Sequence, residues 1–391
     1  MSRLELIATA AFGLEAVVSR ELTELGYTEQ MVEDGRVSFI GDELAICRTN
    51  LWLRSADRVL LRVGTFPAPD FDQLFDKTMD LPWTTWLPVD AKFPVEGKSV
   101  RSVLHHPPSI QRAVKKAIVE SLKKSYQRHW FQESGVEYPI EISILRDLAT
   151  LTIDTSGDGL HKRGYRRLGG IAPLRETTAA GLVLLSYWNP DRPFIDPFCG
   201  SGTIAIEAAL IGRNRAPGIG RSFLSEQWPQ IPRECWKQAR EEAKDKLRGK
   251  PAFPLMASDI DPQAIKLAEQ HARSASVLGD IHFREMDVLE LKAIHDYGVI
   301  ICNPPYGERL GDASSAEAIY DDMADAFAPL STWSMYVLTS HPGFEHFFRR
   351  RSDRRRKLYN GRIECTYYQF LGPRPPGAAP ESESREAWAM Y

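Results

Sequence analysis

The stretch that most constrains the fold of this chain is the nonapeptide from Ile195 to Thr203, which reads IDPFCGSGT. A short apolar run ends at Asp196, two glycines follow, and the segment TIAIEAALIG then carries apolar side chains with a helical period. A strand, a Gly-x-Gly turn and a helix N-terminus together place backbone N–H groups and the positive end of a helix dipole beside a ligand. The segment therefore predicts an α/β domain with a ligand site at the carboxyl end of a strand.

Asp196 suits a ligand that carries a positive charge, such as an ammonium group, and the glycines let a ligand lie against the backbone. The turn alone does not identify the ligand. Gly200-x-Gly202-x-x-Ala205 also fits the dinucleotide fingerprint, and a packing turn without any ligand would look the same. In dinucleotide sites, however, an acid that binds the ribose lies about twenty residues beyond the turn. Residues 213–221 contain no acid, which counts against NAD.

A second strand end carries the segment Asn303-Pro304-Pro305-Tyr306, directly after the apolar run at 299–302. The two prolines fix φ and remove two N–H donors, so the loop is stiff. The Asn303 amide can accept hydrogen bonds, and Tyr306 offers a flat face for stacking. Such a loop fits a planar group bearing an NH2, although a stiff loop without a ligand is the alternative interpretation.

The composition predicts a cytoplasmic protein of two or three domains with no membrane segment and no metal. No apolar run approaches the length of about 18 residues that a membrane helix needs, and acids and Arg20 interrupt the N-terminal apolar residues, unlike a signal peptide. The five cysteines are scattered without a metal-binding spacing, which favours free thiols in a reducing compartment.

Charge is unevenly distributed along the chain, whose net charge is −3. Residues 97–130 contain eight Lys or Arg and one acid, and residues 349–357 contain seven Lys or Arg and one acid. Basic clusters within an acidic whole indicate phosphate-binding surfaces, unless each is only a solvated helix face.

The N-terminal segments alternate in a ferredoxin-like order of strand, helix, strand, strand, helix and strand, at residues 4–10, 12–26, 28–33, 36–40, 43–53 and 58–66. A second unit follows, with strands predicted at 91–95, 140–145 and 149–154 and a long helix at 109–130. The sequence Lys98-Ser99-x-Arg101-Ser102 and the helix start Ser109-Ile110-Gln111-Arg112-x-x-Lys115-Lys116 resemble a THUMP domain, a module associated with RNA-modifying enzymes.

From residue 4 to about 372 the chain resembles the bacterial THUMP-containing guanosine N2-methyltransferases that act on large-subunit ribosomal RNA. It also resembles archaeal and eukaryotic relatives that act on tRNA. The resemblance implies S-adenosylmethionine (SAM) as cofactor and ribosomal RNA, naked or within a pre-ribosomal particle, as partner. It further implies that Asp259 binds the ribose, that Asp261 caps a helix, and that Asp287 binds the adenine.

The expected site residues form three groups. The catalytic residues are Asn303, Pro304, Pro305 and Tyr306. The cofactor-binding residues are Asp196, Phe198, Gly200, Gly202, Thr203, Asp259, Ile260, Asp287 and Asn303. The RNA-binding residues are Lys98, Arg101, Arg112, Lys115, Lys116 and, in the basic link at 160–166, Lys162, Arg163 and Arg166.

The predicted architecture is α/β: a ferredoxin-like module at 1–66, a THUMP domain at 67–158, a Rossmann-like methyltransferase domain at 159–372 and a disordered tail at 373–391. The predicted function is SAM-dependent methylation of a guanosine N2 in large-subunit ribosomal RNA, a step of rRNA processing. The alternatives are methylation of adenine N6 or of a protein glutamine, whose enzymes use Asn-Pro-Pro-Tyr loops, and an inactive RNA-binding assembly factor.

Overall fold

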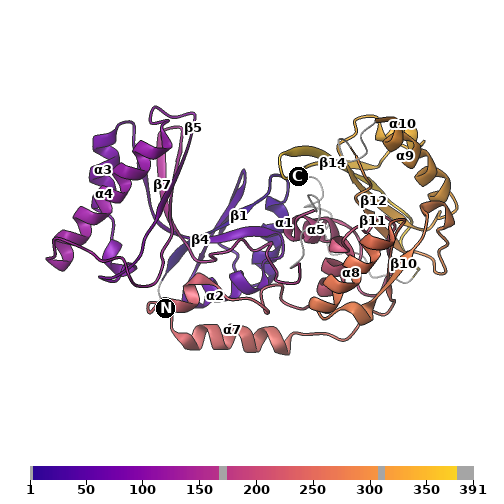
Figure 1. Ribbon diagram of the computed structural model, residues 1–391, viewed down its shortest axis with the longest axis horizontal. Helices are drawn as coiled ribbons and strands as arrows, with labels where there is room; N and C mark the ends of the chain where they lie inside the picture. The colour runs from indigo at the N-terminus through magenta and orange to yellow at the C-terminus, as the bar shows by residue number, and fades with distance from the viewer. Residues whose placement is uncertain (1–2, 167–173, 307–312, 377–391) are drawn as a thin grey trace.

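The computed structural model describes residues 3–166, 174–306 and 313–376, so the predicted disordered tail lies outside the described residues from 377 onward. The strands form two seven-stranded sheets. Figure 1 shows the two sheets side by side along the long axis of the molecule, with helix α7 (Arg233–Asp245) running beneath the middle.

The first half of the first sheet is the predicted ferredoxin-like unit, in the predicted order of elements. Its strands lie in the order β2-β3-β1-β4. Strand β4 then pairs antiparallel with β7 (Leu148–Asp154), so the sheet continues without a break into the second unit. The elements are β1 (Leu4–Ala10), α1 (Glu15–Glu24), β2 (Gln30–Glu33), β3 (Arg36–Gly41), α2 (Glu43–Trp52) and β4 (Ala56–Pro67).

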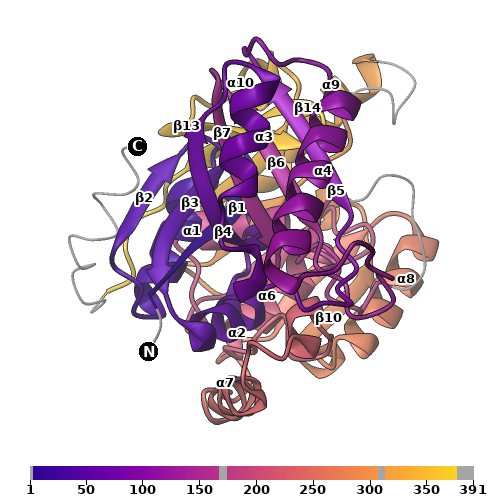
Figure 2. The ribbon, with the colours of Figure 1, turned by 90° about the vertical axis from the view of Figure 1, so that its left-hand side faces the viewer.

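The second unit completes this sheet with β5 (Val95–Val100), β6 (Ile140–Leu145) and β7 (Leu148–Asp154), covered on one face by α3 (Phe71–Met79) and α4 (Pro107–Tyr126), as Figure 2 shows. The strand predicted at 91–95 was wrong in its bounds, because residues 91–94 make only an isolated bridge at Lys92 and β5 begins at Val95. The strand instead runs through Lys98 at the sheet edge, where half-exposed and exposed side chains alternate. An edge strand of this kind lacks the apolar run on which the prediction relied.

The second sheet has the order β10-β9-β8-β11-β12-β14-β13. Its first five strands are parallel, β14 runs antiparallel to β12, and β13 runs antiparallel to β14. Strand β8 lies between β9 and β11, so the chain adds strands first on one side and then on the other. In open α/β sheets the crevice outside the carboxyl ends at this switch point is where ligands bind. The elements are α5 (Glu176–Leu185), β8 (Phe194–Asp196), α6 (Thr203–Gly212), β9 (Leu255–Asp259), α8 (Pro262–Ser274), β10 (Ile281–Glu285), β11 (Val299–Cys302), α9 (Ala313–Phe327), β12 (Ser334–Thr339), α10 (Phe344–Phe347), β13 (Arg354–Asn360) and β14 (Ile363–Phe370).

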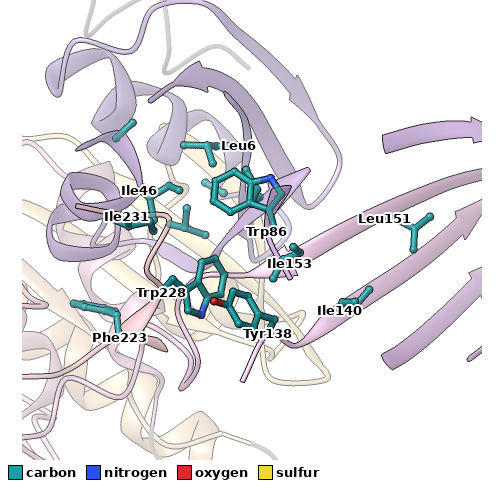
Figure 3. Packing of buried hydrophobic residues seen from close by; sticks show 14 of the residues in the cluster. Leu6, Ile46, Trp86, Tyr138, Ile140, Leu151, Ile153, Phe223, Trp228 and Ile231 are labelled. Atoms are coloured by element: carbon teal, nitrogen blue, oxygen red, sulfur yellow. The ribbon is translucent and has the colours of Figure 1, made fainter. Parts of the chain in front are cut away.

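The segment between α6 and β9 packs against the first sheet rather than the second. Its helix α7 (Arg233–Asp245) lies along α2, where Arg48 and Glu242 form an ion pair of 2.6 Å. Trp228 stacks on Tyr138 with 4.7 Å between ring centroids, and Phe223 and Ile231 enter the same core (Figure 3). Because Leu14 and Val17 of the first unit conversely belong to the core of the second sheet, the proposed modules are bound to each other through shared cores.

All five cysteines are free thiols. Across the described ranges no helix has both the length and the apolar character to cross a membrane. The same ranges hold no cluster of side chains suited to a metal ion.

Candidate active site

Asp196 ends β8 at the switch point and is completely buried. Its Oδ1 accepts a hydrogen bond from the Phe198 N–H at 3.3 Å, while Oδ2 has no hydrogen-bond partner among the described residues. Burial raises the pKa of this carboxyl well above its usual range, and the nearby charge of Asp259 adds to the shift. A buried carboxylate with an open oxygen is costly unless a ligand supplies the missing partner, so the site fits a cationic group.

The two glycines of the turn have different surroundings. Both adopt positive φ, +49° at Gly200 and +80° at Gly202. A Cβ added at Gly200 would meet no atom within 4 Å, so this residue borders open space, whereas a Cβ at Gly202 would lie 2.9 Å from the Ala268 Cβ. Gly202 therefore allows α6 to approach α8, and Gly200 allows close approach from the crevice.

The amides of these glycines are not available as the sequence predicted. The Gly200 N–H donates to Asp259 Oδ2 at 2.9 Å, and the Gly202 N–H donates to the Cys199 carbonyl at 2.8 Å. Both donors are thus used within the protein, the first by Asp259 on the neighbouring strand and the second by a carbonyl of the turn itself. The donors that remain at this point are those of the first turn of α6, which begins at Thr203.

Asp259 ends β9, Ile260 follows it, and Asp287 lies just beyond the neighbouring strand β10, which pairs in parallel with β9 up to Glu285. Asp259 also accepts from the Asp261 N–H through Oδ1, and Asp287 accepts from the Leu289 N–H at 2.9 Å. Ile260, which directly follows Asp259, is 68% exposed, and such exposure is unusual for an isoleucine. An apolar contact flanked by carboxylates fits a nucleoside, whose ring is apolar and whose hydroxyl and amino groups are donors.

Asn303 follows β11, which pairs directly with β8, so this residue lies at the same carboxyl edge of the sheet as Asp196. Its Oδ1 is buried and has no hydrogen-bond partner in the described structure. A buried amide oxygen of this kind is an acceptor prepared for a donor that is brought by a ligand. Pro304 is buried and Pro305 is half-buried beside it.

Tyr306 does not present the open stacking face that the sequence suggested. It is 3% exposed, and its hydroxyl receives hydrogen bonds from Asn360 Nδ2 at 2.9 Å and from the Cys365 Sγ–H at 3.5 Å. The β13–β14 hairpin therefore holds the ring inward in this structure. Sequence reasoning missed Asn360 and Cys365, since they lie more than fifty residues from Tyr306 and only the sheet order brings them together.

The chain matches known protein families along most of its length. Residues 163–369 match the family described as RMKL-like, methyltransferase domain. The chain belongs to this methyltransferase family. The N-terminal part matches the RlmL ferredoxin-like domain over residues 5–60 and the THUMP domain over residues 68–154, so the predicted family and fold class are confirmed.

Three relatives extend this finding. The putative RNA methyltransferase YpsC of Bacillus subtilis is 52% identical, over 95% of this chain and 96% of its own length. The ribosomal RNA large subunit methyltransferase K/L of Syntrophotalea carbinolica is 34% identical, and the match covers 94% of this chain but only 53% of that protein. The crystal structure of SMU.472, a putative methyltransferase complexed with SAH, is 44% identical with a TM-score of 0.91, over 96% of this chain and 100% of that one.

These matches make the chain a THUMP-containing RNA methyltransferase that uses SAM. The residues at the carboxyl edge fit this cofactor: Asp196 has an open oxygen for an ammonium group, Gly200 borders open space, and Ile260 is exposed beside Asp259. When bound, SAM supplies an electrophilic methyl group.

The RNA-binding residues expected in the THUMP domain and the linker fall into two sets. The side chains of Lys98, Arg101, Arg112, Lys116 and Lys162 are exposed, as a phosphate-binding surface requires, although Lys98 and Lys162 pair with Glu141 and Asp158. Lys115, Arg163 and Arg166 are engaged within the protein. Lys115 donates to the Phe93 carbonyl at 2.9 Å and pairs with Glu133, and Arg166 pairs with Glu176 at 3.3 Å.

Arg163 is the clearest correction, because it is 6% exposed and cannot reach an RNA phosphate in this arrangement. Its guanidinium donates to the carbonyls of Leu160 and Arg54 and lies 3.6 Å from Glu207 on α6. Glu207 is completely buried and also accepts from the Tyr165 hydroxyl at 3.0 Å. Arg163 is therefore a buried connection between the ferredoxin-like module and the methyltransferase domain, whereas Lys162 of the same link is exposed.

From these buried contacts of Arg163 we expect a large loss of stability in an Arg163→Ala variant. Removing one partner of a buried ion pair leaves the other charge unpaired and costs about 3–5 kcal/mol. We expect the thermal unfolding midpoint to fall, while Lys162→Ala, which alters an exposed lysine one residue away, should leave it nearly unchanged. An Arg163→Ala protein that unfolds like the wild type but binds RNA weakly would show that the residue contacts RNA instead.

Proposed function

We propose that this protein methylates the exocyclic N2 amine of a guanosine in large-subunit ribosomal RNA. The observation that carries the proposal is the Asn303 amide oxygen, which is buried and without a partner in the described structure, at the sheet edge shared with Asp196. The THUMP domain supports RNA as the substrate. The relative named as a ribosomal RNA large subunit methyltransferase supports the kind of RNA.

The chemistry explains why an amide acceptor is needed. The lone pair of an exocyclic amine is delocalised into the ring, so the nitrogen is a poor nucleophile. Accepting its N–H groups at the Asn303 side chain and the Pro304 carbonyl would fix the nitrogen in line with the methyl group. It would also stabilise the positive charge that develops on nitrogen in the transition state.

The proton balance of the transfer needs no strong base. The nitrogen–methyl bond forms as the methyl–sulfur bond breaks, and the resulting cationic nitrogen is acidic enough to release its proton to water. The target base must first leave any stack in order to reach the crevice.

The exposed basic face of α4 predicts a salt-dependent interaction with RNA. Reversing Arg112, Lys116 and Lys124 to Glu should weaken RNA binding and reduce the slope of log affinity against log salt, by about 0.7–0.9 for each phosphate that the helix no longer neutralises. The matched control reverses Arg233, Lys237 and Lys244, exposed cations on α7, with the same change of charge. Equal slopes in the two triple variants would exclude a specific role for the α4 face.

The test of the proposal is analysis of the product. The purified protein is incubated with methyl-labelled SAM and ribosomal RNA from a strain lacking the gene, and the digested nucleosides are separated by mass spectrometry. We expect labelled N2-methylguanosine. Labelled N6-methyladenosine would support the adenine alternative. The absence of any labelled nucleoside would favour either an inactive assembly factor or a protein glutamine methyltransferase.

A further inference from the structure

A cavity of about 420 Å³ opens where the ferredoxin-like module meets the methyltransferase domain. Its lining includes Phe12, Asp57, Arg175, Thr178, Tyr359 and Gly361. We propose that this cavity binds an unpaired nucleotide of the RNA substrate that neighbours the target base. The inference rests on the proposed function in taking RNA as the substrate, and it adds a site that none of the expected RNA-binding residues belongs to.

The position of the cavity follows from the sheet. Strand β14 runs antiparallel to β12 with Thr366 opposite Thr339, so the tip of the β13–β14 hairpin projects beyond the carboxyl edge that carries Asn303. Asn360, between Tyr359 and Gly361 in the cavity wall, donates to the Tyr306 hydroxyl. The Asn360 side chain therefore connects the cavity wall to the catalytic loop. The nucleotide next to a flipped-out base would pass along this wall.

Phe12 supplies a surface on which a base can stack. The side chain is 46% exposed and meets Tyr359 edge to face, with 5.8 Å between centroids and an angle of 84°. Its neighbour Gly13 is pressed against β13, because a Cβ there would lie 2.4 Å from the Lys357 carbonyl, and Arg356 donates to the Gly13 carbonyl at 3.2 Å. An exposed aromatic ring on a backbone fixed in this way is a preorganised stacking platform for a nucleobase.

Arg175, which lines the same cavity, supplies a contact for phosphate. Its side chain is 53% exposed, and its nearest approach to Asp57 is 4.0 Å, too long for a hydrogen bond. Asp57 instead accepts from the Thr177 hydroxyl at 3.1 Å. A guanidinium has five N–H donors in a planar fork that suits phosphate oxygens. An aromatic face and a guanidinium that line one cavity of ligand size together match the chemistry of one nucleotide.

The test compares Phe12→Leu with Phe12→Tyr, because both retain apolar bulk and only the second retains a ring. With ribosomal RNA from the deletion strain as substrate, Phe12→Leu should raise the KM for RNA about tenfold, as expected when one stacked base loses its aromatic platform. Phe12→Tyr should stay close to the wild type, and Arg175→Gln should raise the KM more than Arg175→Lys. SAM affinity and the thermal unfolding midpoint should be unchanged in all four variants. A KM for Phe12→Leu within twofold of the wild type overturns the inference.

A second measurement identifies the nucleotide. In a short RNA that spans the modified position, an abasic site is placed at each neighbouring nucleotide in turn. At one position the abasic RNA should raise the KM for the wild type but add nothing further for Phe12→Leu, since both changes remove the same interaction. Additive effects at every position contradict the proposal. Failure of the proposed function is seen separately, as a labelled product other than N2-methylguanosine from the wild-type protein.

Discussion

Replacing Asn303 with alanine is expected to lower the turnover of methyl transfer by about a hundredfold, the usual effect of removing one preorganised polar group from a transition state. Affinity for SAM should stay nearly unchanged. The physical reason is that Asn303 Oδ1 is buried without a partner among the described residues of the free protein. The proposed hydrogen bond to the target amine would then strengthen only as the nitrogen becomes positively charged.

Single-turnover rates with saturating RNA measure this chemical step directly, and calorimetry measures cofactor binding. The matched control is Asn189→Ala, whose side chain accepts from the Asp191 N–H in the turn before β8, at the opposite edge of the sheet. That variant should keep wild-type turnover. If Asn303→Ala lost cofactor affinity as strongly as it lost rate, Asn303 would be a cofactor-binding or structural residue.

The second large effect is expected from Asp196→Asn, which should weaken SAM binding by about tenfold or more without destabilising the free protein. A hydrogen bond to a charged group contributes about 1.5–3 kcal/mol, and the substitution removes the buried charge that the ammonium group would meet at the end of β8. Burial disfavours the ionised carboxylate in the free protein, so a neutral amide should leave its unfolding midpoint equal or higher. Calorimetry and thermal unfolding of the same sample test both halves.

The pH dependence of SAM binding follows from the raised pKa of Asp196. The pKa of Asp196 is raised in the free protein, and a bound cation favours the ionised form and lowers it again. Lowering the pH should therefore weaken SAM binding to the wild type, as protons compete for the carboxylate, and Asp196→Asn should lose most of this dependence. The control Asp261→Asn keeps the cap of α8 and should bind like the wild type. Unchanged affinity in Asp196→Asn would refute the assignment.

Sequence patterns predicted the strand ends well, because each one is a local signal. Asp196, Asp259 and Asn303 each follow a short apolar run, and parallel strands bring such residues to one edge. The edge strand through Lys98 was missed because its polar side chains give no apolar run.

Local sequence patterns did not predict interactions between segments that are far apart in the chain. The sequence showed that Arg163 is basic but not that Glu207 and the Arg54 carbonyl would bury it. Likewise, Tyr306 was predicted as an open ring, whereas the hairpin residue Asn360 holds its hydroxyl. In both cases the partner that fixes the side chain comes from another element. No local sequence pattern indicates a partner that lies so far along the chain.

The most direct test of guanine N2 as the target uses RNA in which inosine replaces the modified guanosine. Inosine retains the ring, the O6 atom and the stacking face and lacks only the 2-amino group. We expect wild-type protein to methylate the guanosine RNA and to leave the inosine RNA unlabelled at that position, although both RNAs should bind with similar affinity. Methylation of the inosine RNA at the same nucleotide would contradict the proposal that N2 accepts the methyl group.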